Sequence, residues 1–156
     1  MDNFYWKMHC IDNIKFSQTN ISLFFKNPNH GHIFNLIKKI HNEIQLIHKD
    51  YNSYNYASKE DDPIFKILQE KSISVINYDR NFWTISNRRF FCIKYVLQEL
   101  LNFSEPAKIW VKYYESEKDY QFGEVFQKKY NEAREDLLKY PNRIDINDFG
   151  RFFFKK

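Results

Sequence analysis

The first part of the chain alternates apolar and polar residues, which is the pattern of a half-buried strand. Ile14 and Phe16 precede the polar run Gln18-Thr19-Asn20, and Ile21, Leu23 and Phe25 follow it. This arrangement predicts a β-hairpin from Ile14 to Lys26. An earlier stretch alternates in the same way and predicts a strand that adds to the hairpin; its apolar positions are Phe4, Trp6, Met8 and Cys10.

The period then changes from two residues to between three and four, the spacing of one face of a helix. The apolar positions of this stretch are Ile33, Ile37, Ile40, Ile44 and Ile47. The spacing predicts a helix over this range, with Asn29 as its cap. The polar, tyrosine-rich run 50–58 follows its end.

Three further helices are predicted by their caps and stripes. Asp62-Pro63 joins an oxygen cap to a residue suited to the first helical position, so a short helix runs to about Glu70. Ser86 or Asn87 caps a longer helix, whose apolar stripe consists of Phe90, Ile93, Leu97 and Leu100. The last helix runs from about Asp119 to Tyr140, and Pro141 ends it.

Two other segments carry strand patterns. Apolar residues at 73–75 and 83–85 flank the polar run 77–81, which predicts paired strands around a loop. The segment 109–114 fits a strand as well as a helix. Together the elements predict a single α+β domain over residues 1–156, with three long helices, one short helix and a small antiparallel sheet. The alternative is a mostly helical domain.

Aromatic residues make up 19% of the 156 residues, whereas only three are glycine. Lys outnumbers Arg, and Asn, Ile, Tyr and Phe are frequent, as in the proteins of an AT-rich genome. Aromatic clusters in such a chain indicate core more often than a platform for stacking bases. Three separated glycines leave little material for a phosphate-binding loop.

No motif in the chain indicates catalysis or metal binding. His41 and His48 are seven residues apart, about 10 Å along a helix, so they cannot share one metal ion. Cys92 lies in mid-helix between apolar residues, which is typical of a packing role rather than of a nucleophile. We therefore expect no metal, no cofactor and no enzymatic activity. An active site assembled only by folding stays open as an alternative.

The tyrosine-rich loop is the candidate surface for a protein partner. Tyrosines mixed with acidic residues are typical of exposed binding surfaces, where the rings act as rigid anchors. The candidate residues are Tyr51, Tyr54, Tyr56, Glu60 and Asp61. They predict a non-catalytic protein-binding domain, of the inhibitor or immunity type, that neutralises a toxin or enzyme by direct binding. The aromatic tail Phe152 to Phe154 is expected to pack back on the domain.

The alternative function is that of a small nucleic-acid-binding regulator. Arg88 and Arg89 lie at the start of a predicted helix, with Lys94 nearby, and side chains at such a start can reach base edges and phosphates. A net charge of +4 permits such binding without requiring it.

The two cysteines and the hydropathy of the chain indicate its compartment. Cys10 and Cys92 are far apart within apolar segments, which favours free thiols in a reducing environment. No stretch approaches 18 uninterrupted apolar residues. The sequence therefore predicts a cytoplasmic protein without a membrane partner.

Overall fold

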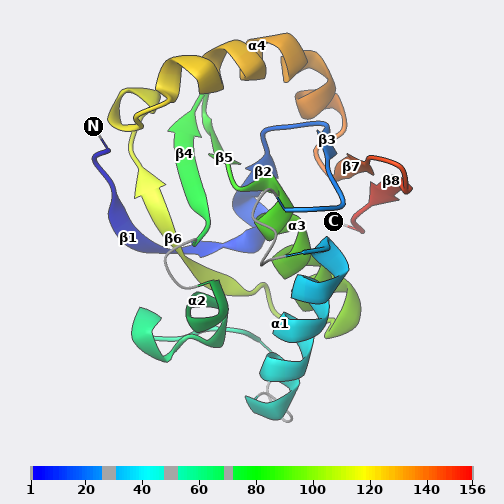
Figure 1. Cartoon of the computed structure of the whole chain (residues 1–156). Helices are drawn as coiled ribbons and strands as arrows, with labels where there is room; N and C mark the ends of the chain where they lie inside the picture. The colour runs from blue at the N-terminus through cyan, green and yellow to red at the C-terminus, as the bar shows by residue number, and fades with distance from the viewer. Residues whose placement is uncertain (1, 26–30, 48–52, 69–71, 156) are drawn as a thin grey trace.

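The computed structural model of the protein describes residues 2–25, 31–47, 53–68 and 72–155, which form an α+β structure (Figure 1). Its helices are α1 (Ile33–Ile47), α2 (Pro63–Leu68), α3 (Asn87–Lys94), which continues as a π-helical segment (Tyr95–Leu100), and α4 (Gly123–Lys139). Its strands are β1 (Tyr5–Cys10), β2 (Ile14–Phe16), β3 (Asn20–Ile21), β4 (Ser74–Tyr78), β5 (Asn81–Thr84), β6 (Lys108–Tyr114), β7 (Arg143–Ile146) and β8 (Gly150–Phe153).

The central sheet has five strands in the order β1-β6-β4-β5-β2 and is mixed. The pairs β1–β6 and β4–β5 are antiparallel, whereas β4–β6 and β2–β5 are parallel. The expectation of a small antiparallel sheet is therefore wrong. Parallel neighbours need long crossover connections. The chain supplies them through α1 and α2, between β2 and the β4–β5 hairpin, and through α3, between β5 and β6.

The predicted hairpin from Ile14 to Lys26 is also wrong, because its two halves belong to different sheets. β2 pairs with β5, whereas β3 pairs in parallel with β7 in a second sheet of order β3-β7-β8. Ser17, between them, is held by buried polar contacts: its N–H donates to Asn87 Oδ1 (2.9 Å) and its hydroxyl to the Thr84 carbonyl (2.5 Å). These bonds satisfy the backbone where the chain leaves the central sheet.

Helices pack on both faces of the central sheet. Strand register places Ile76, Trp83 and Tyr114 on one face, where they form a core with Phe126 and Tyr130 of α4. The opposite face contributes to a larger core that includes α1 and α3. There Phe16 of β2 packs on Phe90 of α3, with ring centroids 5.2 Å apart. Figure 1 shows α4 along the top of the view and α1 and α2 below the strands.

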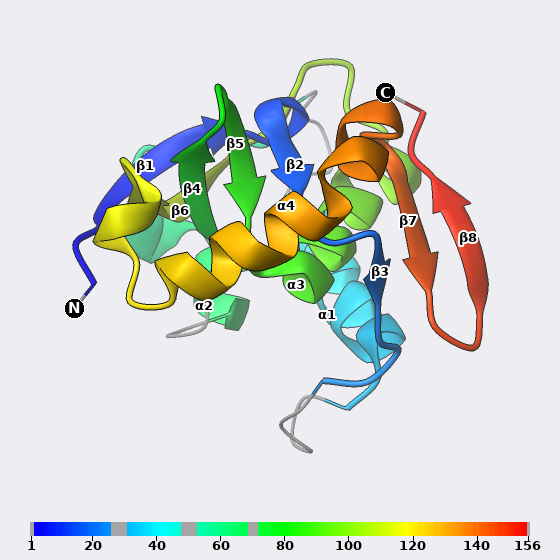
Figure 2. The same ribbon diagram turned by 90° about the horizontal axis from the view of Figure 1, so that it is seen from above.

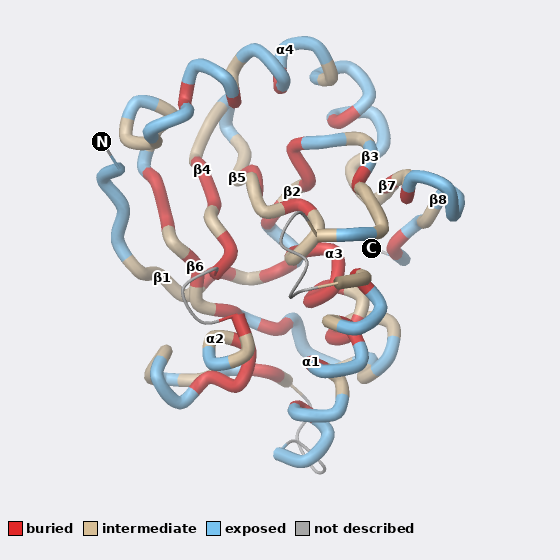
Figure 3. The backbone as a smooth tube through the Cα atoms, in the orientation of Figure 1, coloured by how far each residue is buried: buried red, intermediate tan, exposed pale blue. Residues whose placement is uncertain are grey.

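Several predicted elements are confirmed. α1 buries the first four isoleucines of the predicted stripe, Ile33 to Ile44, whereas Ile47 at its end is 45% exposed. Figure 3 shows the other side of the helix exposed. Asn29 lies outside the described residues. Asp62 caps α2 as predicted, since its Oδ1 accepts a hydrogen bond from Ile64 N (2.8 Å). The undecided segment 109–114 is strand β6, in which Ile109 and Val111 are buried.

The sequence patterns did not predict the carboxyl-terminal hairpin β7–β8. Phe154, just after β8, is 4% exposed and packs in the larger core, which confirms the expected packing of the tail at that residue. Phe153 is 60% exposed. Figure 2 shows β8 as the outermost strand of its sheet.

Candidate protein-binding surface

The tyrosine-rich loop does not present the expected surface. Tyr54 has no exposed area, so the prediction that it is an exposed anchor is wrong. Its hydroxyl accepts a hydrogen bond from Ile64 N (3.1 Å), and its carbonyl accepts one from Lys108 N (2.9 Å). Tyr56 is half-buried against the Tyr54 ring, and its carbonyl accepts a bond from Trp110 Nε1 (2.9 Å). The loop thus fills the space between α2 and β6.

The acidic part of the same loop is exposed. Glu60 contacts the ammonium group of Lys59 and accepts a hydrogen bond from the Ser58 hydroxyl (2.8 Å). These two contacts lower the pKa of Glu60 to about 2. Asp61 is exposed as well, whereas Tyr51 lies outside the described residues. Of the predicted partner-binding set, Glu60 and Asp61 are the residues that the structure places on the surface.

Of the three candidate nucleic-acid contacts, two bind backbone carbonyls of neighbouring segments and the third is buried. Arg88 donates to the Phe24 carbonyl (Nη1 to O 2.6 Å), and Arg89 donates to the Ser72 carbonyl (Nη1 to O 3.0 Å). Lys94 is only 3% exposed, so the expectation that it lies on a binding surface is wrong. α3 is covered on most sides, and its cations hold neighbouring segments in place.

The cysteines and histidines form no obvious reactive centre in the described part of the chain. Cys92 is buried, as predicted, and burial raises the pKa of its thiol. His41 is half-buried on α1. Among the described residues, no three His, Cys, Asp or Glu side chains lie close enough to hold a metal ion. His30 and His48 lie outside these residues.

The surface instead carries a row of contacting aromatic rings, which we call the aromatic ladder: Phe24, His32, Phe34 and Phe149. Successive ring centroids are 5.0, 4.7 and 5.2 Å apart. Phe24, Phe34 and Phe149 are 58%, 39% and 65% exposed. Large rings in mutual contact yet open to solvent form the kind of apolar patch that marks an interaction site.

Local backbone geometry builds the ladder from three segments. Phe24 and His32 form an isolated antiparallel bridge, closed by bonds from Ile33 N to Leu23 O (2.8 Å) and from Phe25 N to Gly31 O (2.9 Å). Gly31 has a φ of 60°, a conformation that glycine adopts without strain.

The two other rings are fixed at element ends. His32 Nδ1 accepts a hydrogen bond from Phe34 N (3.1 Å) in the first turn of α1, where backbone donors lack partners within the helix. Phe149 lies in the β7–β8 turn, and its N–H donates to the Ile146 carbonyl (3.0 Å). Hydrogen bonds of the backbone therefore fix the segments that carry His32, Phe34 and Phe149.

Sequence reasoning missed the ladder because no stretch of the chain contains it. Phe24 lies within a predicted strand and Phe34 within a predicted helix, while Phe149 lies more than a hundred residues further on. One signal was available at Phe34: it lies off the isoleucine stripe of α1, on the side that an amphipathic helix exposes.

Two cavities lie away from the ladder and are small. One, of about 100 Å³, lies beside the π-helical segment and is lined by Asp12 and Glu99 among others. The second, of about 120 Å³, lies under the first half of α4 beside Ser17 and Phe122. Pockets for drug-sized ligands usually measure about 300–1,000 Å³. Both are well below that size.

Comparison of the chain with protein-family models, with curated proteins and with solved structures found no match. The structure defines its class, an α+β protein with a mixed five-stranded sheet and a separate three-stranded sheet. No helix in the described residues is long and apolar enough to cross a membrane.

Proposed function

We propose that the protein is a non-catalytic protein-binding domain that uses the aromatic ladder as its contact surface. The observation that carries the proposal is the continuous row of ring contacts in which His32 joins Phe24 to Phe34 and Phe34 contacts Phe149, with all three phenylalanines exposed. Aromatic anchors of this kind lose little conformational entropy on binding and dominate the energetics of many interfaces.

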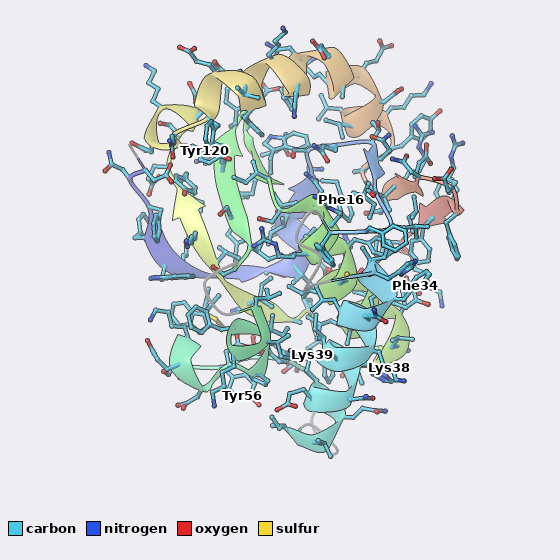
Figure 4. The ribbon with its side chains drawn as sticks, in the orientation of Figure 1. Phe16, Phe34, Lys38, Lys39, Tyr56 and Tyr120 are labelled. Carbon is cyan, nitrogen blue, oxygen red and sulfur yellow. The ribbon has the colours of Figure 1, made fainter. Side chains whose placement is uncertain are left out.

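The charge beside the ladder defines the chemistry of the partner. Lys38 is exposed and lies one helical turn after Phe34, so both share one side of α1. Figure 4 shows these two side chains on the same side of the helix and Lys39 on the other. We therefore expect a partner surface with an apolar pocket for the rings and a carboxylate that faces Lys38.

The form of binding that we propose is inhibition. A small domain that presents rigid rings can cover the active surface of a toxin or an enzyme, as immunity-type proteins do, without chemistry of its own. The proposed compartment is the cytoplasm. The free cysteines Cys10 and Cys92 support it, because unpaired thiols are usual in a reducing compartment.

The test is recovery of the partner by variants of the tagged protein. Phe34→Ser combined with Phe149→Ser removes two rings of the ladder. This variant should recover about tenfold less, or still less, of the partner that the wild-type protein binds. Phe122→Ser is the matched control, since Phe122 is 54% exposed but lies outside the ladder. Equal losses for the ladder variant and the control would contradict the proposal.

Charge reversal tests the expected chemistry of the partner. Lys38→Glu should weaken the recovered complex and reduce its dependence on salt, whereas Lys39→Glu, on the other side of α1, should change neither. Nuclease treatment of the sample tests the alternative function. Loss of the bound material on nuclease treatment would replace protein binding by nucleic-acid binding.

A further inference from the structure

The second sheet ends in an open edge. Its order is β3-β7-β8, and in the described chain β8 has β7 on one side and no strand on the other. Gly150, Arg151 and Phe153 of this strand are exposed. An open edge offers unpaired backbone groups that can pair with another strand.

Backbone hydrogen bonds of the second sheet show which residues of β8 face outward. Asp145 N donates to Thr19 O, and Asn147 N donates to Ile21 O, so odd-numbered residues of β7 face β3 and even-numbered ones face β8. Ile144 is opposite Phe152 in the β7–β8 register. The N–H and C=O groups of Phe152 therefore face β7, whereas those of Arg151 and Phe153 face the open side.

We infer that this edge pairs with the same edge of a second copy of the chain. In an antiparallel pair centred on Phe152, Arg151 of each copy lies opposite Phe153 of the other. Each of these two Arg151–Phe153 pairs then joins residues that face outward, so each pair exchanges two backbone hydrogen bonds. The resulting sheet has six strands, in the order β3-β7-β8-β8-β7-β3, and obeys two-fold symmetry.

Charge selects this register over its neighbours. A pair centred on Arg151 would place two guanidinium groups directly opposite each other. A pair centred on Phe153 would place Arg151 opposite Lys155 of the second copy. Like charges opposite one another destabilise a strand pair, whereas a cation beside an aromatic ring is favourable. The register centred on Phe152 alone of these three opposes no like charges.

Side chains near the edge fit the symmetric pair. On the outer face, Arg151 forms an ion pair with Asp145 (2.9 Å), which partly neutralises its charge before association. On the inner face, Phe152 packs on Phe91, Tyr95 and Phe154. Pairing brings the Phe152 rings of the two copies together and extends this aromatic cluster.

Sedimentation velocity of the purified protein over a range of concentrations tests the inference. The wild type should shift reversibly from the mass of one chain to twice that mass. Phe153→Glu should preserve the dimer, because each new carboxylate lies opposite Arg151 of the other copy. Phe153→Lys should weaken it about tenfold or more, because each new ammonium lies opposite the same Arg151. Phe122→Lys, a matched charge at an exposed ring outside the second sheet and the ladder, should leave it unchanged.

Amide hydrogen exchange of the wild type tests the same edge without a substitution. The N–H groups of Arg151 and Phe153 should exchange more slowly as the concentration rises, whereas that of Phe152, already bonded to β7, should not change. A wild type that stays monomeric at every concentration would overturn the inference. So would a dimer that Phe153→Lys leaves intact. The ladder variant should dimerise normally, so this result is independent of partner binding.

Discussion

Lys94 brings an ammonium group into the larger core. The Nζ atom lies 5.0, 5.7 and 5.9 Å from the ring centroids of Phe154, Phe90 and Phe16. In the described residues no carboxylate lies within ion-pair distance of it. Burial lowers the pKa of Lys94 to about 8, and the nearby Asp12 only partly opposes this. The three rings supply cation–π attraction in place of hydration.

This burial predicts that Lys94→Met stabilises the protein at pH 7. The folded protein releases the Lys94 proton at a lower pH than the unfolded chain, so the unfolded chain binds more protons between about pH 8 and pH 10.5. The free energy of unfolding of the wild type therefore rises with pH in this window. Below the window, the destabilisation caused by the buried ammonium group is constant. The variant should gain about 1–3 kcal/mol at pH 7 and little at pH 10.5.

Chemical denaturation of both proteins at the two pH values measures this difference. Lys38→Met is the control, because Lys38 is exposed and its loss should leave the stability unchanged at both. A Lys94→Met variant that is destabilised equally at pH 7 and pH 10.5 would contradict the account of the buried ammonium.

At the scale of elements, the hydrophobic periods predicted most helices and strands but not how the strands pair. α1, α2 and the β4–β5 hairpin follow from local patterns and caps, because the signals that define them lie within a few residues. Pairing of β2 with β5 and of β3 with β7 depends on contacts between residues about seventy and more than a hundred positions apart. The alternation in β2 and β3 is the same whichever partner they take.

The start of α4 depends on Gly123, a feature that no pattern indicated. The predicted helix began near Asp119, but residues Glu117–Asp119 form a 3₁₀ turn against the first turn of α4. A Cβ atom at position 123 would lie 2.0 Å from the carbonyl oxygen of Glu117. Glycine therefore allows this close approach of backbone.

Gly123→Ala should destabilise the protein by about 1–3 kcal/mol, although alanine favours helices, because α4 must move away from Glu117. That movement disturbs the packing of Phe126 and Tyr130 on the sheet. Glu124→Ala changes the next, exposed residue and should alter stability by no more than a few tenths of a kcal/mol. Thermal unfolding of both variants provides the comparison. A neutral or stabilising Gly123→Ala would show that the helix start can shift freely.

At the scale of the whole molecule, the proposed binding surface exists only through the tertiary fold. The turn before α1, its first turn and the β7–β8 turn each contribute to the ladder, and Arg88 of α3 holds the Phe24 segment. Because aromatic residues are frequent in the chain, aromatic clusters were expected to lie in the core more often than on the surface. Trp83, Phe90 and Tyr54 are indeed buried. Which rings remain outside follows from the arrangement of the sheets and could not be predicted from their neighbours in sequence.

The most direct test of the account is amide hydrogen exchange of the protein alone and in complex with its recovered partner. Binding through the aromatic ladder should slow exchange together in 22–25, 32–38 and 147–150, while 53–62 and 86–94 stay unchanged. Protection confined to 53–62 or 86–94, with the three ladder segments unaffected, would contradict the proposed surface.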